Sequence, residues 1–146
     1  MNDEYIKIAY DEAREAYNNN EVPVGAVIVK NGEVLSKTHN MNKTTGMIDA
    51  HAEMLAIKEA SLKINDWRLN DCEMYVTLEP CPMCAGAIVQ SRIRKVYIGT
   101  SSNVSSNKNI VKMIFNNDEY YHKVEYEYLN DVNCSNILST FFSNKR

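Results

Sequence analysis

The stretch YVTLEPCPMCAG, residues 75–86, decides the fold of this 146-residue chain. Met74–Leu78 is a short apolar run typical of a buried strand, and Cys84–Val89 begins an apolar helix after two prolines. Cys81 and Cys84 lie three residues apart in the first helical turn, so both sulfurs point to the same side. The positive end of the helix favours their thiolate forms. The stretch therefore predicts a strand–turn–helix unit that presents two sulfur ligands.

A second motif supplies the missing groups of a metal site. His51, Ala52 and Glu53 stand where a loop enters a helix predicted through Ala60. His51 can act as a third ligand, and three nitrogen and sulfur ligands leave a tetrahedral zinc one open position, as in catalytic sites. Glu53, two residues further on, can face that position and transfer protons. We therefore predict a zinc site with Glu53 as its catalytic residue.

Two other interpretations of the cysteine pair remain open from the residues alone. The zinc site can be structural, and four side chains can then supply its fourth ligand: Cys72, Cys134, His39 and His122. The pair can also be a redox dithiol. The two motifs together match the signature H-x-E…P-C-x-x-C of zinc deaminases, and this match favours the catalytic interpretation.

The rest of the chain predicts one α/β domain over residues 1–146. Strands alternate with helices, which implies a sheet covered on both faces. The further predicted elements, in chain order, are a helix that follows a cap at Asn2-Asp3 and ends near Asn18–Asn20, a hairpin over Val24–Leu35 that turns at Asn31-Gly32, a loop over Asn40–Asp49, a strand over Val96–Gly99, a loop over Ser101–Asn109, a helix over Ile110–Phe115, a strand over Val124–Leu129 and a terminal helix with Ile137, Leu138, Phe141 and Phe142 on one face.

The composition of the chain limits the cellular environment and the binding partners that we expect. No segment has the apolar length of a membrane span or the pattern of a signal peptide, so we expect a cytoplasmic protein with reduced cysteines. The net charge of −3 argues weakly against a nucleic-acid partner. The stretch between Glu79 and Asp118 nevertheless contains bases and no acid. This basic stretch is either an RNA contact or an ordinary solvated surface.

The sequence resembles the bacterial tRNA adenosine deaminases over nearly its whole length. The matching segments are Glu21–Ala26, Asn40, Ala50–Glu53, Trp67–Leu69, Tyr75–Gly86, Ser91–Ile93 and Phe141-Phe142. This family converts the wobble adenosine of certain anticodons to inosine. The resemblance implies a three-layer α/β/α fold around a five-stranded mixed sheet, a homodimer with one zinc ion per subunit, and a tRNA anticodon stem-loop as partner.

The resemblance also assigns roles residue by residue. It implies that His51, Cys81 and Cys84 bind zinc, that Glu53 transfers protons, and that Asn40 contacts the target base. Val24, Ala26 and Ala52 are the expected walls of the base pocket. Arg92, Arg94, His122 and Lys123 are the expected RNA contacts.

Three departures from the family pattern bear on the substrate: Ile48-Asp49, Ser101–Val104 and Tyr121. We expect all three in loops near the site or the RNA groove. Two rival functions therefore stay in view, a deaminase of a free base or nucleoside such as guanine or cytosine, and a non-catalytic protein stabilised by zinc. Phe141-Phe142 followed by Lys145-Arg146 resembles the RNA-acting family and favours an RNA substrate.

Overall fold

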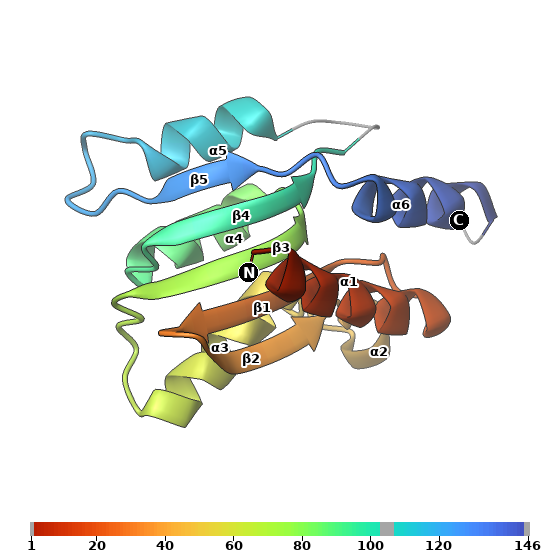
Figure 1. Cartoon of the computed structure of the whole chain (residues 1–146), viewed down its shortest axis with the longest axis horizontal. Coiled ribbons are helices and arrows are strands. Elements are labelled where there is room, and N and C mark those ends of the chain that lie inside the picture. The colour runs from red at the N-terminus through yellow and green to blue at the C-terminus, as the bar shows by residue number, and fades with distance from the viewer. Residues whose placement is uncertain (1, 103–106, 145–146) are drawn as a thin grey trace.

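The computed structural model describes residues 2–102 and 107–144. Its centre is one five-stranded sheet in the order β2-β1-β3-β4-β5 (Figure 1). β1 pairs antiparallel with both β2 and β3, whereas β3–β4 and β4–β5 are parallel pairs. The strands are β1 Gly25–Lys30, β2 Glu33–His39, β3 Cys72–Leu78, β4 Lys95–Thr100 and β5 Glu125–Tyr128. The mixed sheet agrees with the predicted fold.

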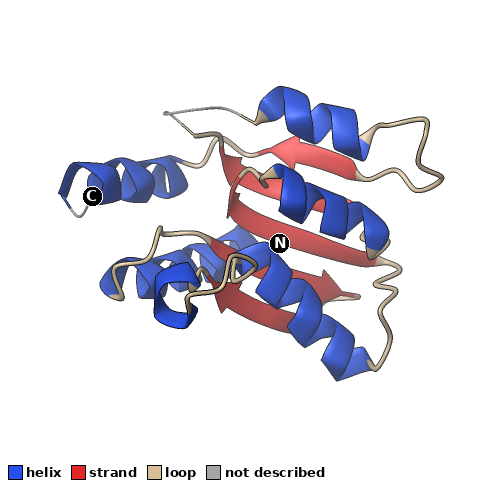
Figure 2. Cartoon of the chain, turned by 180° about the vertical axis from the view of Figure 1, so that it is seen from behind, coloured by secondary structure: helices blue, strands red, loops and turns tan. Residues whose placement is uncertain are grey.

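Helices cover both faces of the sheet, which confirms the three-layer arrangement. α1 and α6 lie on one face, and α3, α4 and α5 lie on the other (Figures 1 and 2). The helices are α1 Asn2–Asn18, α2 Asn42–Thr45, α3 Ala52–Ile64, α4 Pro82–Gln90, α5 Lys108–Phe115 and α6 Val132–Asn144. No helix within the described ranges is both long and apolar enough to cross a membrane.

The side chains of the strands alternate between the two faces of the sheet and form two separate cores, one on each face. Ile28 and Met74 point into the larger core beneath α3, α4 and α5. Val27 and Tyr75, one position along each strand, pack on the opposite side, where α1 lies. Because side chains of a strand alternate between faces, both faces of the central strands must be apolar. The continuous apolar runs in the sequence are thus explained by burial on both sides.

The hairpin and its packing against α1 depend on two glycines. Asn31 and Gly32 have φ of 50° and 79°, as the predicted Asn-Gly turn requires. At Gly25, a Cβ atom would lie 2.0 Å from the carbonyl oxygen of Ala9 in α1. Only glycine allows the helix backbone to approach β1 this closely.

The structure corrects several element boundaries. The predicted loop over Asn40–Asp49 contains the short helix α2, which buries none of its residues and therefore leaves no apolar pattern in the sequence. α6, Val132–Asn144, contains the four predicted face residues, and β5 is shorter than the run Val124–Leu129. Asn103, Val104, Lys145 and Arg146 lie outside the described residues.

Candidate active site

The three candidate zinc ligands converge where α3 and α4 begin. His51 and Cys81 occupy the same position, immediately before the first residue of each helix, with extended ψ angles of 149° and 170°. Cys84 lies in the first turn of α4. His51 Nδ1 is 3.6 Å from Cys81 Sγ and 3.4 Å from Cys84 Sγ. All three donor atoms lie within 4.8 Å of one another, so one ion can contact them together.

The spacing and the chemistry of these donors fit zinc. In tetrahedral geometry, a sulfur ligand at about 2.3 Å and a nitrogen ligand at about 2.0 Å are separated from each other by about 3.5 Å. The two nitrogen–sulfur distances, 3.6 and 3.4 Å, are close to that value. Thiolate and imidazole ligands favour zinc over magnesium or calcium, which prefer oxygen.

Hydrogen bonds within the cluster favour a thiolate at Cys81. A hydrogen bond from the Cys84 thiol lowers the pKa of Cys81 to about 4, although burial opposes the shift and His51 adds to it. The bond with Cys81 in turn raises the pKa of His51. The site thus stabilises the deprotonated sulfur that metal binding requires.

Glu53 is the buried acid of the site. It lies in the first turn of α3 and is only 4% exposed. Burial raises its pKa to about 7, and its carboxyl group hydrogen-bonds the Cys84 thiol. A carboxyl group whose pKa is near neutrality can both accept and return a proton at the pH of the cell. Its position agrees with the predicted proton-transfer role.

Asn40 joins β2 to the start of α3. Its backbone N–H donates to the carbonyl of Val24 at 3.1 Å, and its Oδ1 accepts the N–H of Ala52 at 2.9 Å. That second bond satisfies a free N–H at the helix start, which His51 does not cap with its own side chain. Because Oδ1 is engaged, the side chain offers its amide N–H groups as donors to a ligand.

The three expected pocket-wall residues are all buried, at different depths. Val24 retains 5% exposure, whereas Ala26 and Ala52 retain none. All three belong to the same core cluster beneath α3. Ala26 and Ala52 therefore lie within the core and offer no accessible surface to a ligand in this structure.

Three polar residues that organise the site were missed from the sequence. On β2, Ser36 Oγ donates to the carbonyl of Ala56 at 2.9 Å, and Thr38 Oγ1 donates to that of Ala52 at 2.7 Å. These bonds attach α3 to the sheet. The spacing of two hydroxyl residues on one strand face was an available signal.

The third missed residue is Glu79, which precedes the cysteine motif and is 3% exposed. Its carboxylate accepts the N–H groups of Ser102 and Asn107 at 3.2 and 2.7 Å and the hydroxyl of Tyr128 at 3.0 Å. It connects the carboxyl ends of β3, β4 and β5. Its partners are distant in the sequence, which explains why no local pattern indicates them.

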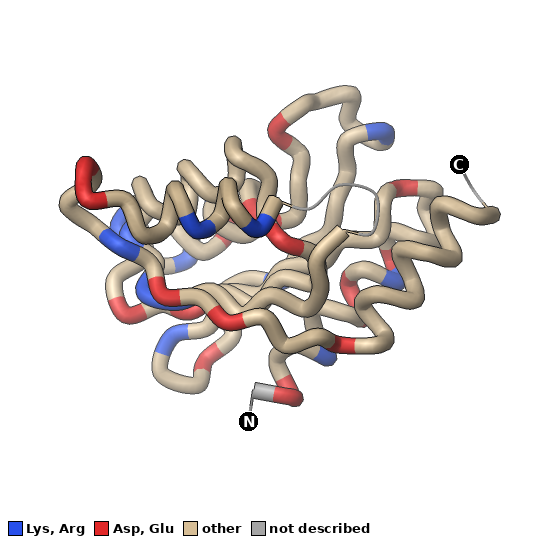
Figure 3. The backbone as a smooth tube through the Cα atoms, turned by 90° about the horizontal axis from the view of Figure 1, so that it is seen from above, with Lys and Arg blue, Asp and Glu red and all other residues tan. Residues whose placement is uncertain are grey.

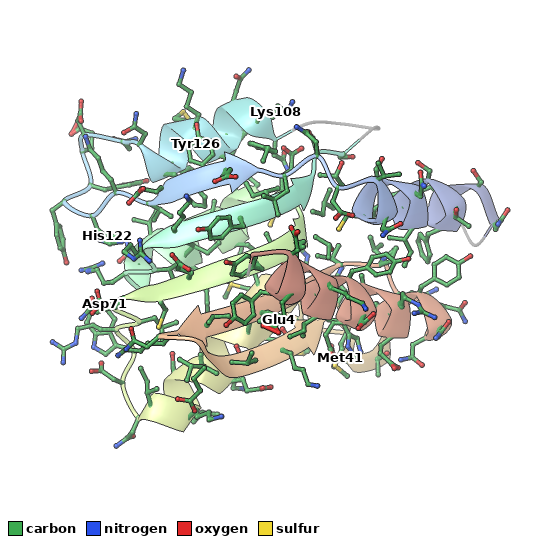
Figure 4. All side chains as sticks on the ribbon, in the orientation of Figure 1. Glu4, Met41, Asp71, Lys108, His122 and Tyr126 are labelled. Carbon is green, nitrogen blue, oxygen red and sulfur yellow. The ribbon has the colours of Figure 1, made fainter. Side chains whose placement is uncertain are left out.

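The four expected RNA contacts lie at the opposite end of the sheet from the candidate site. Arg92 and Arg94 lie between α4 and the start of β4, and His122 and Lys123 precede β5 (Figure 4). β3, with its seven residues, separates this end from Cys81 by about 20 Å. Tyr121 lies at the same distant end, beside Arg92 and not near the site; its expected place in a loop near the site or the RNA groove is therefore narrowed to the second of these. Ile48 and Asp49 lie in the loop that leads to the candidate ligand His51, three and two residues before it.

Each of these four side chains already has an intramolecular partner. Arg94 forms an ion pair with Glu73, and Lys123 with Asp118. His122 Nε2 lies 2.9 Å from the carbonyl oxygen of Ile93. Arg92 donates to the carbonyls of Val89 and Gln90. In this arrangement the four side chains lie too far from the site to contact a base bound in the same subunit.

Residues 2–102 and 107–144 contain no fourth protein ligand for the site. Among the described residues, the only group of metal-binding side chains is His51, Cys81 and Cys84. Of the four alternatives, His39 is bonded to Glu12 and His122 to a backbone carbonyl. Cys72 and Cys134 are buried and unbridged. The arrangement favours the open catalytic type of site over the closed structural one.

The fold and the site together define a deaminase of the zinc-binding class. Residues 1–100 match the family model described as the cytidine and deoxycytidylate deaminase zinc-binding region. The chain is 45% identical to the tRNA-specific adenosine deaminase of Aquifex aeolicus, over 97% of this chain and 94% of that protein. It is 33% identical to a solved tRNA:A34 deaminase, with a TM-score of 0.85, over 92% and 99% of the two chains.

A guanine deaminase from Bacillus subtilis is also similar, at 29% identity and a TM-score of 0.69, over 100% and 98% of the two chains. Both relationships place the chain in one superfamily, and the adenosine deaminases match it better in sequence and in fold. The chain belongs to the family of the tRNA-specific adenosine deaminases. It is an enzyme, a hydrolase that acts on a C–N bond.

Proposed function

We propose that this enzyme converts adenosine to inosine at the wobble position of a tRNA anticodon, with zinc bound by His51, Cys81 and Cys84. The observation that carries the proposal is a buried Glu53 beside three donor atoms that leave a tetrahedral ion one free position. The tRNA substrate comes from the relatives, among them the Aquifex protein at 45% identity.

The chain's own residues account for binding and proton transfer. When bound, zinc supplies a Lewis acid that lowers the pKa of a coordinated water to about 7. Glu53 accepts the proton that the attacking water loses and donates it to the ring nitrogen. It then accepts the proton of the newly added hydroxyl group and donates it to the amine, which leaves as ammonia as the C–N bond breaks. Asn40 orients the base through its amide donors. Val24, whose carbonyl accepts the N–H of Asn40, supplies an apolar side chain for the base to pack against.

The target nucleotide must leave its stack to reach these groups. An anticodon loop presents unstacked bases, so it costs less to flip than a duplex. We further propose a homodimer with one zinc ion per subunit. In such a dimer, RNA bound at one subunit's site also contacts the other subunit.

Deamination of a free base is the second candidate, supported by the similarity to the guanine deaminase. Both reactions use the same zinc site, so the substrate alone distinguishes them.

The test is to incubate the purified zinc-loaded protein with an anticodon stem-loop containing adenosine at position 34. Parallel reactions contain adenine, adenosine, guanine, cytosine and cytidine. Base conversion is scored by mass spectrometry of the digested RNA. Inosine in the stem-loop alone supports the proposal, whereas turnover of guanine without the stem-loop overturns the substrate and leaves the zinc mechanism intact.

A further inference from the structure

The segment of residues 41–50 joins the candidate base contact Asn40 to the candidate ligand His51. The N–H of Met41 donates to the carbonyl of Ala50 at 2.8 Å and closes the segment into a loop. α2 forms the first half of this loop, at the end of the molecule where α1 ends (Figure 1). Because α2 buries none of its residues, hydrophobic packing does not explain its position.

A buried carboxylate holds α2 instead. Glu21, which follows α1, is 2% exposed. Its Oε1 accepts the N–H of Lys43 at 3.1 Å, and its Oε2 accepts the N–H and the hydroxyl of Thr44 at 2.6 and 2.8 Å. Burial alone would raise the pKa of Glu21, but these hydrogen bonds outweigh it and lower the pKa. Glu21 is therefore a charged anchor that connects α1 to α2.

The second half of the loop is held by its own side chains. Asn42 Nδ2 donates to the carbonyls of Met47 and Ile48 at 2.8 and 3.2 Å, and Thr45 Oγ1 accepts the N–H of Met47 at 3.1 Å. Met47 and Ile48 are 58% and 82% exposed. The loop therefore presents an ordered, exposed apolar tip that precedes His51 by three and four residues along the chain.

We propose that Glu21 is a positioning residue for RNA capture: by holding α2, it fixes the loop of residues 41–50 in the orientation that receives the nucleotides around the target base. The inference deepens the proposed function and rests on it. Without the anchor, RNA must order the loop as it binds, and this cost lowers affinity. The groups that perform hydrolysis lie on α3 and α4, and Ser36 and Thr38 attach α3 to the sheet independently.

The first variant is Glu21→Gln, which keeps the shape of the side chain but places an amide N–H group against the loop's donors. We expect KM for the stem-loop to rise about tenfold, with kcat within about twofold, because the anchor acts on binding. Zinc content and melting temperature should stay close to those of the parent protein. The dissociation constant, measured by fluorescence anisotropy in a Glu53→Gln background, should rise by the same factor.

A matched pair on the exposed α2 keeps the test decisive if Glu21→Gln does not fold. Thr44→Val removes one of the three hydrogen bonds and should raise KM about threefold, whereas Thr44→Ser keeps the hydroxyl and should not change it. Unchanged KM in both Glu21→Gln and Thr44→Val overturns the inference, as does a loss of kcat with loss of zinc. If the parent protein does not act on the stem-loop at all, the proposed function fails first, and the inference falls with it.

Discussion

The two ends of the parallel strands differ in how they use their polar side chains. At the carboxyl ends, the polar groups are buried and each has a defined partner: Glu21, Glu53 and Glu79 are all less than 5% exposed. At the amino ends, the charged groups are solvent-exposed ion pairs such as Lys123 with Asp118. Acidic and basic positions are interspersed at this end, on the left of Figure 3.

The difference follows from the cost of burying charge. A buried carboxylate is tolerated only where several donors surround it, so its presence indicates a site that the fold maintains for a purpose. Exposed ion pairs contribute little to stability and little information about function. We therefore expect substitutions at the carboxyl ends to have large effects on activity, and matched substitutions at the amino ends to have small ones.

The largest effect is expected from removing a candidate ligand. Cys84→Ala should abolish zinc binding and reduce activity to background, because two donors cannot hold the ion that the reaction needs. Cys72→Ala is the matched control, since Cys72 is an equally buried thiol at the amino end of β3. Zinc content by atomic absorption should fall only in the first variant. Retention of zinc by Cys84→Ala would contradict the ligand assignment.

The next effect is expected from the buried acid. Glu53→Gln should lower kcat about a thousandfold while zinc content stays unchanged, because the amide cannot accept or return the proton. Glu73→Gln is the control at the amino end, where Glu73 pairs with Arg94. Its kcat should stay within about twofold of the parent value, since exposed ion pairs contribute little. Equal turnover in the two variants would remove Glu53 from the mechanism.

Asn40 caps the start of α3 in the structure and is proposed to contact the target base, and substitutions can separate these two roles. Asn40→Asp keeps the oxygen that accepts the N–H of Ala52 but removes the amide donors. We expect kcat/KM to fall about a hundredfold with little change in melting temperature, because the substrate then has no amide donor at this position. Asn40→Ala should also lose about 1 kcal/mol of stability, the usual cost of losing a helix cap. If Asn40→Asp kept full activity, Asn40 would be a structural cap alone.

The sequence alone predicts those features of the two ends that depend on the local spacing of residues. Two cysteines in one helical turn and a histidine two residues before a glutamate identify the site, because each motif stands at the start of a helix. The Asn31-Gly32 turn and the apolar central strands were likewise predictable from local chemistry.

The sequence was not sufficient where partners are distant along the chain. Nothing in the sequence distinguishes Glu21 and Glu79 from ordinary acidic residues, because their hydrogen-bond donors lie 22 or more residues away along the chain. The place of Arg92 at the opposite end depends on the direction of α4 relative to β3, which charge alone does not indicate. α2 escaped prediction because a four-residue helix with no buried side chain has no periodicity.

The smallest effect is expected at the amino ends, where Arg92 and Arg94 were predicted to contact RNA. Arg92 lies 5.4 Å from the ring centre of Trp67 and 4.4 Å from that of Tyr121, two rings that are 57% and 87% exposed. Exposed contacts of this kind are worth about 0.5–1 kcal/mol, so Arg92→Gln should lower the melting temperature slightly. Because the site lies about 20 Å away along β3, KM for the stem-loop should stay within about twofold.

This last measurement also tests the proposed dimer, because a second subunit can bring its own amino-end arginines to the RNA bound by the first subunit. In that case the Arg92→Gln, Arg94→Gln double variant raises KM, and the slope of log KM against log salt concentration changes by about one for each phosphate that the two arginines bind in the parent protein. A salt slope equal to that of the parent protein leaves the two arginines as surface structure. A shallower slope shows that the two arginines bind phosphates of the RNA, and the amino ends of the sheet then take part in substrate binding as the carboxyl ends do.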